Sequence, residues 1–211
     1  MASTTYTHND LCLLAKSWLL RSNSRGGHGC QVALTECRSG WGGEMPDAIG
    51  FRAAGMLPES VVVEVKVSRA DFLADFKKPH RTDGAGLGQF RYYLCPEGII
   101  TPDDLPERWG LLTVNERGQL KALQGPVAIS NNSGTFPAAC EPWRHSRDIE
   151  RELWLLVRVT ARVDDPDKIK TTLNAAQREQ ARLTRICESQ SQELRQLRQA
   201  KADAGWDELR E

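Results

Sequence analysis

The chain has 211 residues, which is enough for one domain with its own core and an appended segment. Its 28 basic and 28 acidic side chains give a formal net charge of zero, which excludes a bulk electrostatic attraction to nucleic acid. The six cysteines form no Cys-x-x-Cys pair, and His28, Cys30 and Cys37 lack the spacing and the fourth ligand of a structural zinc site. No segment has the pattern of an export signal or a membrane span, so we expect a cytoplasmic protein with reduced thiols and no membrane partner.

The first part of the chain predicts a helix followed by a run of short strands. Asn9 and Asp10 can cap a helix over residues 10–22, whose apolar side chains fall on one face. Runs rich in β-branched and aromatic residues predict strands near the following ranges: 30–36, 46–52, 60–67 and 90–95. A second helix is predicted over residues 69–78, and Pro79 ends it.

Two further strands and a helix are predicted after residue 100. The strands cover residues 109–114 and 119–123 and flank a turn at residues 115–118. Residues 124–142 are rich in Gly, Pro, Ser and Asn, which is typical of a loop or long connection. A helix over residues 145–163 is amphipathic, and we expect its apolar side chains to face the core: Ile149, Leu153, Trp154, Val157 and Ala161.

The composition changes after Pro166, because residues 167–203 contain no aromatic residue and no glycine. Heptad spacing places apolar and polar residues in two columns: Leu173, Gln180, Cys187 and Leu194 in one, and Ala176, Leu183, Gln190 and Leu197 in the other. We therefore predict a folded domain over residues 1–163 and a helical segment over residues 164–211. That segment is either a coiled coil that joins two copies or docks a partner, or a helix that folds back on its own domain, or a frayed tail.

Two charged side chains on an otherwise apolar strand are the main functional signal. In the run of residues 61–67, Glu64 and Lys66 share one face, because side chains alternate along a strand. An unpaired buried charge is costly, so these groups need a partner or a bound ion. Asp47, on the neighbouring strand of a predicted hairpin, would join Glu64 in supplying the oxygen ligands that Mg²⁺ prefers. The Val65 carbonyl would add a ligand, and Lys66 would orient or deprotonate a metal-bound water.

Pro46-Asp47 followed by Glu64-x-Lys66 resembles the motif of the PD-(D/E)XK nuclease superfamily. The flanking segments are also similar to that superfamily. Residues 47–51 resemble its first metal-ligand strand, and residues 64–78 resemble its core strand with the following helix. Residues 90–96 resemble the next strand, and Leu105-Pro106 with residues 109–112 continues the pattern. The chain is similar to the small MmcB-like endonucleases of bacteria and their phages, over roughly residues 30–115.

The resemblance implies an α/β (α+β) fold of the restriction-endonuclease type, with a mixed central sheet flanked by helices and here a long C-terminal helix. It implies a nuclease that uses Mg²⁺ or Mn²⁺, acts on DNA and works in the cytoplasm of a bacterium or a phage-infected cell. Asp47, Glu64 and Lys66 would be catalytic, and a further upstream carboxylate often joins them. We favour Glu36, at the end of a predicted strand, over Glu44 in a glycine-rich loop, because a strand fixes a ligand better.

Other residues near the motif would either bind nucleic acid or have a purely structural role. Five basic side chains would either neutralise phosphates or form a solvated helix end and loop: Arg69, Lys77, Lys78, Arg81 and Arg91. Gln89 and Tyr93 fit a Gln-x-x-x-Tyr spacing found in some members of the superfamily. That alignment needs a helix, however, and residues 90–95 predict a strand.

Two classes of function follow. The first is a metal-dependent nuclease that cuts DNA, with a homodimer formed through the C-terminal helix. The second is a non-catalytic protein that keeps the nuclease-like fold and binds a nucleic acid or a protein partner. The complete set of Asp47, Glu64 and Lys66 favours the enzyme, because a decayed site should lose at least one member.

Overall fold

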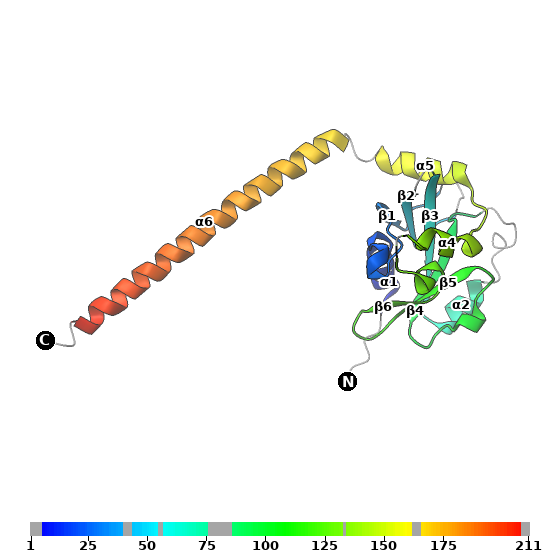
Figure 1. The fold of residues 1–211 in the computed structure, drawn as a ribbon, viewed down its shortest axis with the longest axis horizontal. Helices are drawn as coiled ribbons and strands as arrows, with labels where there is room; N and C mark the ends of the chain where they lie inside the picture. Colours follow the sequence, from blue (N-terminus) through cyan, green and yellow to red (C-terminus); the bar gives the residue numbers. More distant parts are fainter. Residues whose placement is uncertain are drawn as a thin grey trace. The chain divides into compact units, whose positions relative to one another are not determined.

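A computed structural model describes residues 6–39, 44–54, 57–75, 86–132, 134–161 and 166–207 (Figure 1). Its contacts divide the chain into two units, Met1–Val157 and Arg158–Glu211. The boundary predicted between residues 163 and 164 lies outside the described residues. The first unit contains the sheet, and the second contains the long C-terminal helix.

The first unit is built on one mixed sheet of six strands in the order β1 to β6. Its strands are β1 (Val32–Thr35), β2 (Ala48–Ala54), β3 (Leu57–Val65), β4 (Phe90–Pro96), β5 (Trp109–Val114) and β6 (Leu120–Gln124). β3, β4 and β5 run parallel to one another, and the other neighbours are antiparallel. The predicted α+β class, with a mixed sheet flanked by helices, is therefore confirmed. Every predicted strand is present, with its ends within three residues of the prediction.

One face of the sheet is covered by α1 (His8–Leu20), which packs across β1 to β4. Thr7 caps this helix: its side chain accepts a hydrogen bond from the Asp10 backbone, and the Asp10 carboxylate accepts one from the Thr7 backbone. The cap predicted at Asn9 and Asp10 is therefore wrong, since both residues lie inside the first turn. The buried side of α1 packs on the valines of β3 and the apolar residues of β4 in one core cluster.

The other face of the sheet carries α2 (Arg69–Asp75) and a second core cluster. Tyr93 stacks on Trp109 with ring centroids 4.5 Å apart, and Phe72 meets the Tyr93 ring edge-on at 5.1 Å. These contacts hold α2 against β4, beside the charged residues of β3. Residues 76–78 of the predicted helix lie outside the described residues.

Residues 124–142 form a long connection, which was one of the two alternatives predicted, but not a plain loop. It contains α3 (Pro126–Ile129), α4 (Phe136–Cys140) and the 3₁₀ turn η4 (Glu141–Trp143). Each of the three has a proline in its first turn, where a helix tolerates this residue. Three side chains of this segment are buried in the core beside α1: Val127, Phe136 and Cys140.

α5 (Ile149–Thr160) is anchored by polar contacts, and the prediction that its apolar side chains face the core is wrong. These side chains are exposed instead: Ile149 (62%), Leu153 (58%), Trp154 (37%), Val157 (59%) and Ala161. Buried Glu152 accepts hydrogen bonds from the Ser60 hydroxyl at 2.6 Å and the Gly88 N–H at 2.9 Å. It also pairs with Arg147 at 2.9 Å. The inner side of α5 therefore carries Glu152, whose carboxylate meets hydrogen-bond donors there, together with buried Leu155.

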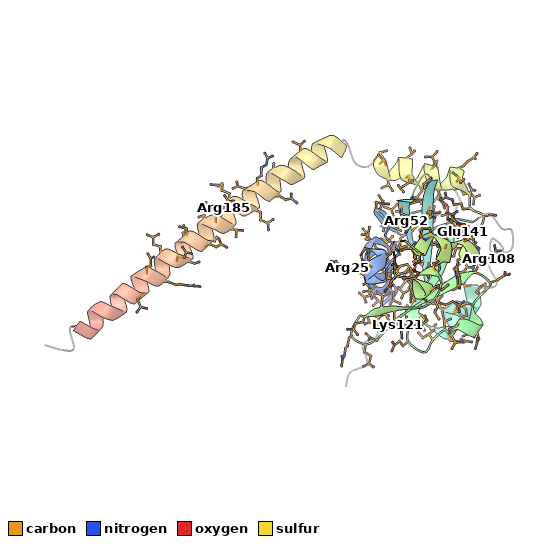
Figure 2. All side chains as sticks on the ribbon, in the orientation of Figure 1. Arg25, Arg52, Arg108, Lys121, Glu141 and Arg185 are labelled. Atoms are coloured by element: carbon orange, nitrogen blue, oxygen red, sulfur yellow. The ribbon has the colours of Figure 1, made fainter. Side chains whose placement is uncertain are left out.

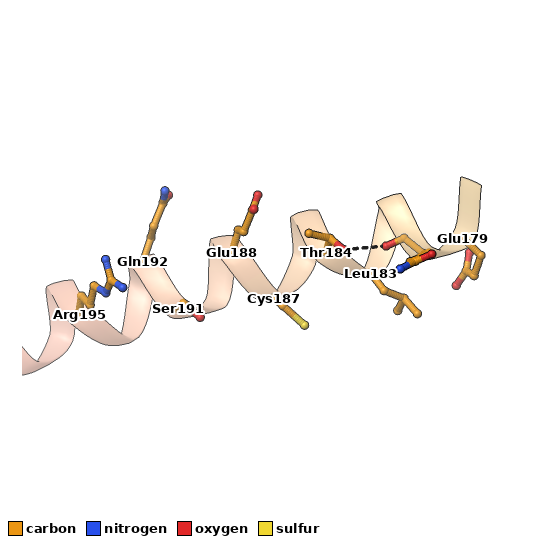
Figure 3. Close-up of a pocket in the computed structure, with 9 residues that line it drawn as sticks. Glu179, Leu183, Thr184, Cys187, Glu188, Ser191, Gln192 and Arg195 are labelled. Carbon is orange, nitrogen blue, oxygen red and sulfur yellow. Dashed lines mark hydrogen bonds between the residues drawn. The ribbon is translucent and has the colours of Figure 1, made fainter. Parts of the chain in front are cut away.

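The second unit contains α6 (Pro166–Asp207), a single helix of 42 residues, so the predicted C-terminal helix is confirmed. Its described side chains are exposed and project around the helix, Arg185 among them (Figure 2). One side of α6 forms a shallow, open hollow that includes Leu183 and Cys187 (Figure 3). Across the described ranges, no helix combines the length and apolar character needed to cross a membrane.

His28 is enclosed in the core beside α1. It is fully buried, and neither ring nitrogen has a hydrogen-bond partner among the described residues. Four aromatic rings have centroids 5.1 to 6.0 Å from that of the imidazole: those of Trp18, Phe90, Tyr92 and Phe136. Burial, aided by the positive charge of Arg52, lowers the pKa of His28 from 6.5 to about 3. The imidazole is therefore neutral in the folded protein at neutral pH.

We expect His28→Phe to make the protein more resistant to acid. The unfolded chain takes up a proton on His28 near pH 6.5 and the folded chain only near pH 3, so the wild type loses free energy of unfolding as the pH falls between these values. The loss amounts to about 2 kcal/mol at pH 5. Urea unfolding at pH 7 and pH 5 measures it. Phe136→Leu is the control, because it perturbs the same cluster without removing a titrating group, and it should lose as much free energy of unfolding between pH 7 and pH 5 as the wild type. If His28→Phe lost as much as the wild type, His28 would not be the group responsible.

Candidate functional site

The β2–β3 hairpin and the parallel pairing of β3 with β4 position the candidate site. Ala48 pairs with Val63, so Asp47, which immediately precedes β2, lies opposite Glu64. On the other side of β3, Glu64 pairs with Tyr93 of β4. The backbone positions of Asp47, Glu64 and Tyr93 are therefore neighbours near the carboxyl end of β3. Glu64 is buried on the sheet face that also carries α2.

Both carboxylate oxygens of Asp47 have a neighbour. Oδ2 accepts a hydrogen bond of 2.7 Å from the backbone N–H of Val65, the last residue of β3. Oδ1 lies 3.3 Å from Nε2 of His8, the first residue of α1. The Asp47 side chain is 18% exposed, so a ligand from solvent can reach it. Val65, whose N–H orients this carboxylate, ends its strand at the same edge.

Lys66 is held by a carboxylate that the sequence analysis missed. Its Nζ lies 3.3 Å from Oδ1 of Asp75 in α2, and both side chains are buried. The Tyr93 hydroxyl donates a hydrogen bond of 3.1 Å to the other Asp75 oxygen. A buried ammonium needs such a counter-charge. The sequence did carry a signal, because Asp75 follows buried Phe72 by three residues and so lies on the inner side of α2.

The charges of three carboxylates act on the thiol of Cys12, in the second turn of α1. Burial, followed by the charges of Asp47, Glu36 and Glu64, raises the pKa of this thiol to about 12. The same charges favour a cation in their neighbourhood. His8 and Cys12 were not identified as candidate site residues from the sequence. Their four-residue spacing in a predicted helix would have indicated that the two side chains lie on the same side.

Of the two upstream carboxylates, Glu36 lies beside Asp47. Its backbone N–H donates a hydrogen bond of 3.2 Å to the Asp47 carbonyl, and its side chain is exposed. Glu36 does not end a strand as predicted, because it follows β1 in the left-handed region with a φ of 49°. Glu44 points elsewhere: its carboxylate accepts a hydrogen bond of 3.1 Å from the Leu87 N–H and ties the segment before β4 in place.

The Gln-x-x-x-Tyr spacing does not bring its two side chains together. Gln89 immediately precedes β4 and Tyr93 lies within it, so four strand residues separate them by about 13 Å. Tyr93 donates its hydroxyl hydrogen to Asp75, on the α2 side. The side-chain oxygen of Gln89 is buried near the other end of β3 and has no hydrogen-bond partner in the described part of the chain.

The two predicted basic residues that the structure describes are tied to protein atoms. Arg69 forms a two-pronged ion pair with Asp104. Arg91 donates hydrogen bonds to the carbonyls of Gly88 at 3.1 Å and Ser146 at 3.2 Å. The other predicted basic residues lie outside the described residues: Lys77, Lys78 and Arg81.

Comparison with known proteins adds a distant likeness in fold. No protein-family model matches the chain, and no curated protein matches it. A solved structure of a protein of unknown function from Silicibacter pomeroyi is similar, with 19% sequence identity and a TM-score of 0.48. The similarity covers 78% of this chain and 96% of that chain. At this distance the likeness carries no functional argument.

We expect Asp75→Ala to destabilise the protein by about 3 to 5 kcal/mol, because it leaves the Lys66 ammonium buried without its counter-charge. Combining it with Lys66→Met should recover part of this loss, since no charge then remains unpaired. Tyr93→Phe removes one hydrogen bond and should cost only about 1 kcal/mol. Urea unfolding of the single and double variants forms a double-mutant cycle. Purely additive effects of Asp75→Ala and Lys66→Met would contradict a direct pairing.

Proposed function

We propose that the protein is a metal-dependent nuclease that hydrolyses phosphodiester bonds in DNA. One observation carries the proposal: Asp47, immediately before β2, lies opposite Glu64 of β3, and Lys66 immediately follows the end of β3. This is the juxtaposition that membership of the PD-(D/E)XK superfamily would require. The mixed sheet with helices on both faces supports the same assignment.

Asp47 and Glu64 would hold a Mg²⁺ or Mn²⁺ ion, because carboxylate oxygens are the ligands that these ions prefer. Glu36 lies beside Asp47 and would assist, and the Val65 carbonyl belongs to the same strand end. When bound, such an ion lowers the pKa of a coordinated water and neutralises charge on the phosphodiester. The hydrogen bond from the Val65 N–H holds the Asp47 carboxylate in place beforehand, which reduces the cost of reorganisation.

Lys66 would place a positive charge beside the reacting groups. Its Nζ lies 3.3 Å from Oδ1 of Asp75, which holds the ammonium at this position. The N–H groups of an ammonium would suit an attacking water or a phosphate oxygen. Asp75 acts through Lys66 and is therefore a positioning residue, and Tyr93 fixes Asp75 in turn.

The alternative is a non-catalytic protein of the same fold that binds a nucleic acid or a protein partner. The internal contacts of Arg69 and Arg91 favour it, because they withdraw positive charge from a surface that would contact phosphates. The two functions differ in one measurable result, which is the cleavage of DNA.

We expect the purified protein to cleave linear, circular or single-stranded DNA in the presence of Mg²⁺ or Mn²⁺. Asp47→Asn and Glu64→Gln should each lower the rate by about 100-fold or more, because each removes an anionic ligand while keeping the side-chain shape. Glu36→Gln should also lower the rate. Glu44→Gln is the matched control and should retain the rate, since that carboxylate contacts the Leu87 backbone instead.

Two outcomes would decide against the enzyme. Cleavage that survives in both Asp47→Asn and Glu64→Gln would point to a contaminating nuclease. DNA binding without cleavage, at equal affinity in wild type and variants, would favour the non-catalytic alternative. Circular dichroism of each variant shows whether the fold is intact.

We also propose that α6 joins two copies of the chain in a coiled coil. Leu183 and Leu194 lie in different heptad columns and are 49% and 54% exposed. Leu183 and Cys187 project in one direction from α6, and Glu188 and Gln192 project in a different direction (Figure 3). A long helix gains most of its stability by burying such an apolar stripe against a partner.

We expect Leu183→Glu combined with Leu194→Glu to convert a dimer into a monomer, because like charges would meet in the seam. Arg185→Glu is the matched control, since Arg185 lies outside both columns. Sedimentation equilibrium of the full chain measures the change. Cys187 is exposed in a seam column, so mild oxidation should cross-link two copies if the helices are parallel and in register. A wild type that sediments as a monomer would refute the pairing.

A further inference from the structure

Three different metal-binding groups meet at the beginning of α1. His8, Cys12 and Asp47 each offer one ligand atom, and these atoms all lie within 4.8 Å of one another. His8 and Cys12 are four residues apart in one helix, so both face the same side. Asp47 comes to them from the sheet edge just before β2.

The distances suit a small tetrahedral ion. With metal–nitrogen and metal–oxygen bonds of about 2.0–2.1 Å, two ligands of a tetrahedral Zn²⁺ ion lie about 3.3 Å apart. The separation between His8 Nε2 and Asp47 Oδ1 is already 3.3 Å. The Cys12 sulfur, within 4.8 Å of both, needs a movement of no more than about 1.4 Å to complete the set.

The surroundings orient the ligands and favour a cation. The Val65 N–H holds Oδ2 of Asp47, which leaves Oδ1 facing His8. The charges of Asp47, Glu36 and Glu64 all act at Cys12, so a divalent ion there would be strongly attracted. Cys12 is buried while His8 is 44% exposed, so solvent reaches the group from the His8 side.

The ligand types select the kind of metal. Mg²⁺ prefers oxygen and keeps most of its water, whereas thiolate and imidazole are the usual ligands of Zn²⁺. We propose that His8, Cys12 and Asp47 form a zinc site with a fourth position open to water. The site does not depend on nuclease activity, but it shares Asp47 with the oxygen ligands assigned above to Mg²⁺ or Mn²⁺.

Metal binding by the full-length protein tests the site directly. Equilibrium dialysis with Zn²⁺ should give one ion per chain in the wild type. His8→Ala and Cys12→Ser should each weaken zinc binding by more than about 100-fold, which exceeds the effect of losing a residue that only hydrogen-bonds to a metal ligand. Co²⁺ as the probe should produce a thiolate-to-metal absorption band that Cys12→Ser abolishes. Cys187→Ser removes an exposed thiol elsewhere and should change neither result.

The outcomes separate this site from the nuclease proposal. His8 is exposed, so His8→Ala should fold normally even if the buried change Cys12→Ser does not. Absence of zinc binding in the wild type, or unchanged binding in His8→Ala, would overturn the zinc site whether or not DNA is cleaved. If the protein binds zinc, the His8 and Cys12 variants bind it more weakly, and DNA is not cleaved, the zinc site is supported and only the nuclease proposal is contradicted.

Discussion

The hydrogen bond from the Val65 N–H to the Asp47 carboxylate exists because of the register of the β2–β3 hairpin, and the candidate site depends on both. A shift of one residue would turn Glu64 and Lys66 to the face that α1 covers. The valines that alternate with these residues are packed there against α1. Apolar packing on one face of β3 therefore determines where the charged groups of the other face lie. The positions of Glu64 and Lys66 are therefore a consequence of how the core packs.

Two polar networks lie near opposite ends of β3, and their surroundings distinguish their roles. Near its amino end, Glu152 is enclosed and accepts from Ser60 and Gly88 while it pairs with Arg147, so its bonding capacity is used within the protein. Near its carboxyl end, Asp47 remains partly exposed, and one of its oxygens faces an exposed histidine. The first network fastens α5 to the sheet. The second keeps charged groups where solvent and a ligand can reach them.

Local patterns predicted the sheet well, because strand alternation and turn residues act over a few neighbours. The same alternation predicted that Glu64 and Lys66 share a face. Partners contributed by helices were missed, since the position of Asp75 depends on how α2 packs and not on any local signal in β3. The helix over residues 149–160 shows the opposite failure. The side predicted to face inward is exposed, and the inner side carries buried Leu155 together with the hydrogen-bonded Glu152.

Charge at the sheet edge constrains any function that involves DNA. The charges of three carboxylates, Glu36, Asp47 and Glu64, act together at Cys12, and a fourth carboxylate, Asp75, pairs with the Lys66 ammonium. Within the described ranges, the nearby guanidinium groups of Arg69 and Arg91 are tied to other protein atoms. A phosphodiester would add negative charge to this group of carboxylates, so the proposed nuclease would need a divalent cation to offset the repulsion. Asp47 belongs both to the carboxylate pair and to the group with His8 and Cys12. If both proposed sites bind their ions, the two ions would compete for that one carboxylate.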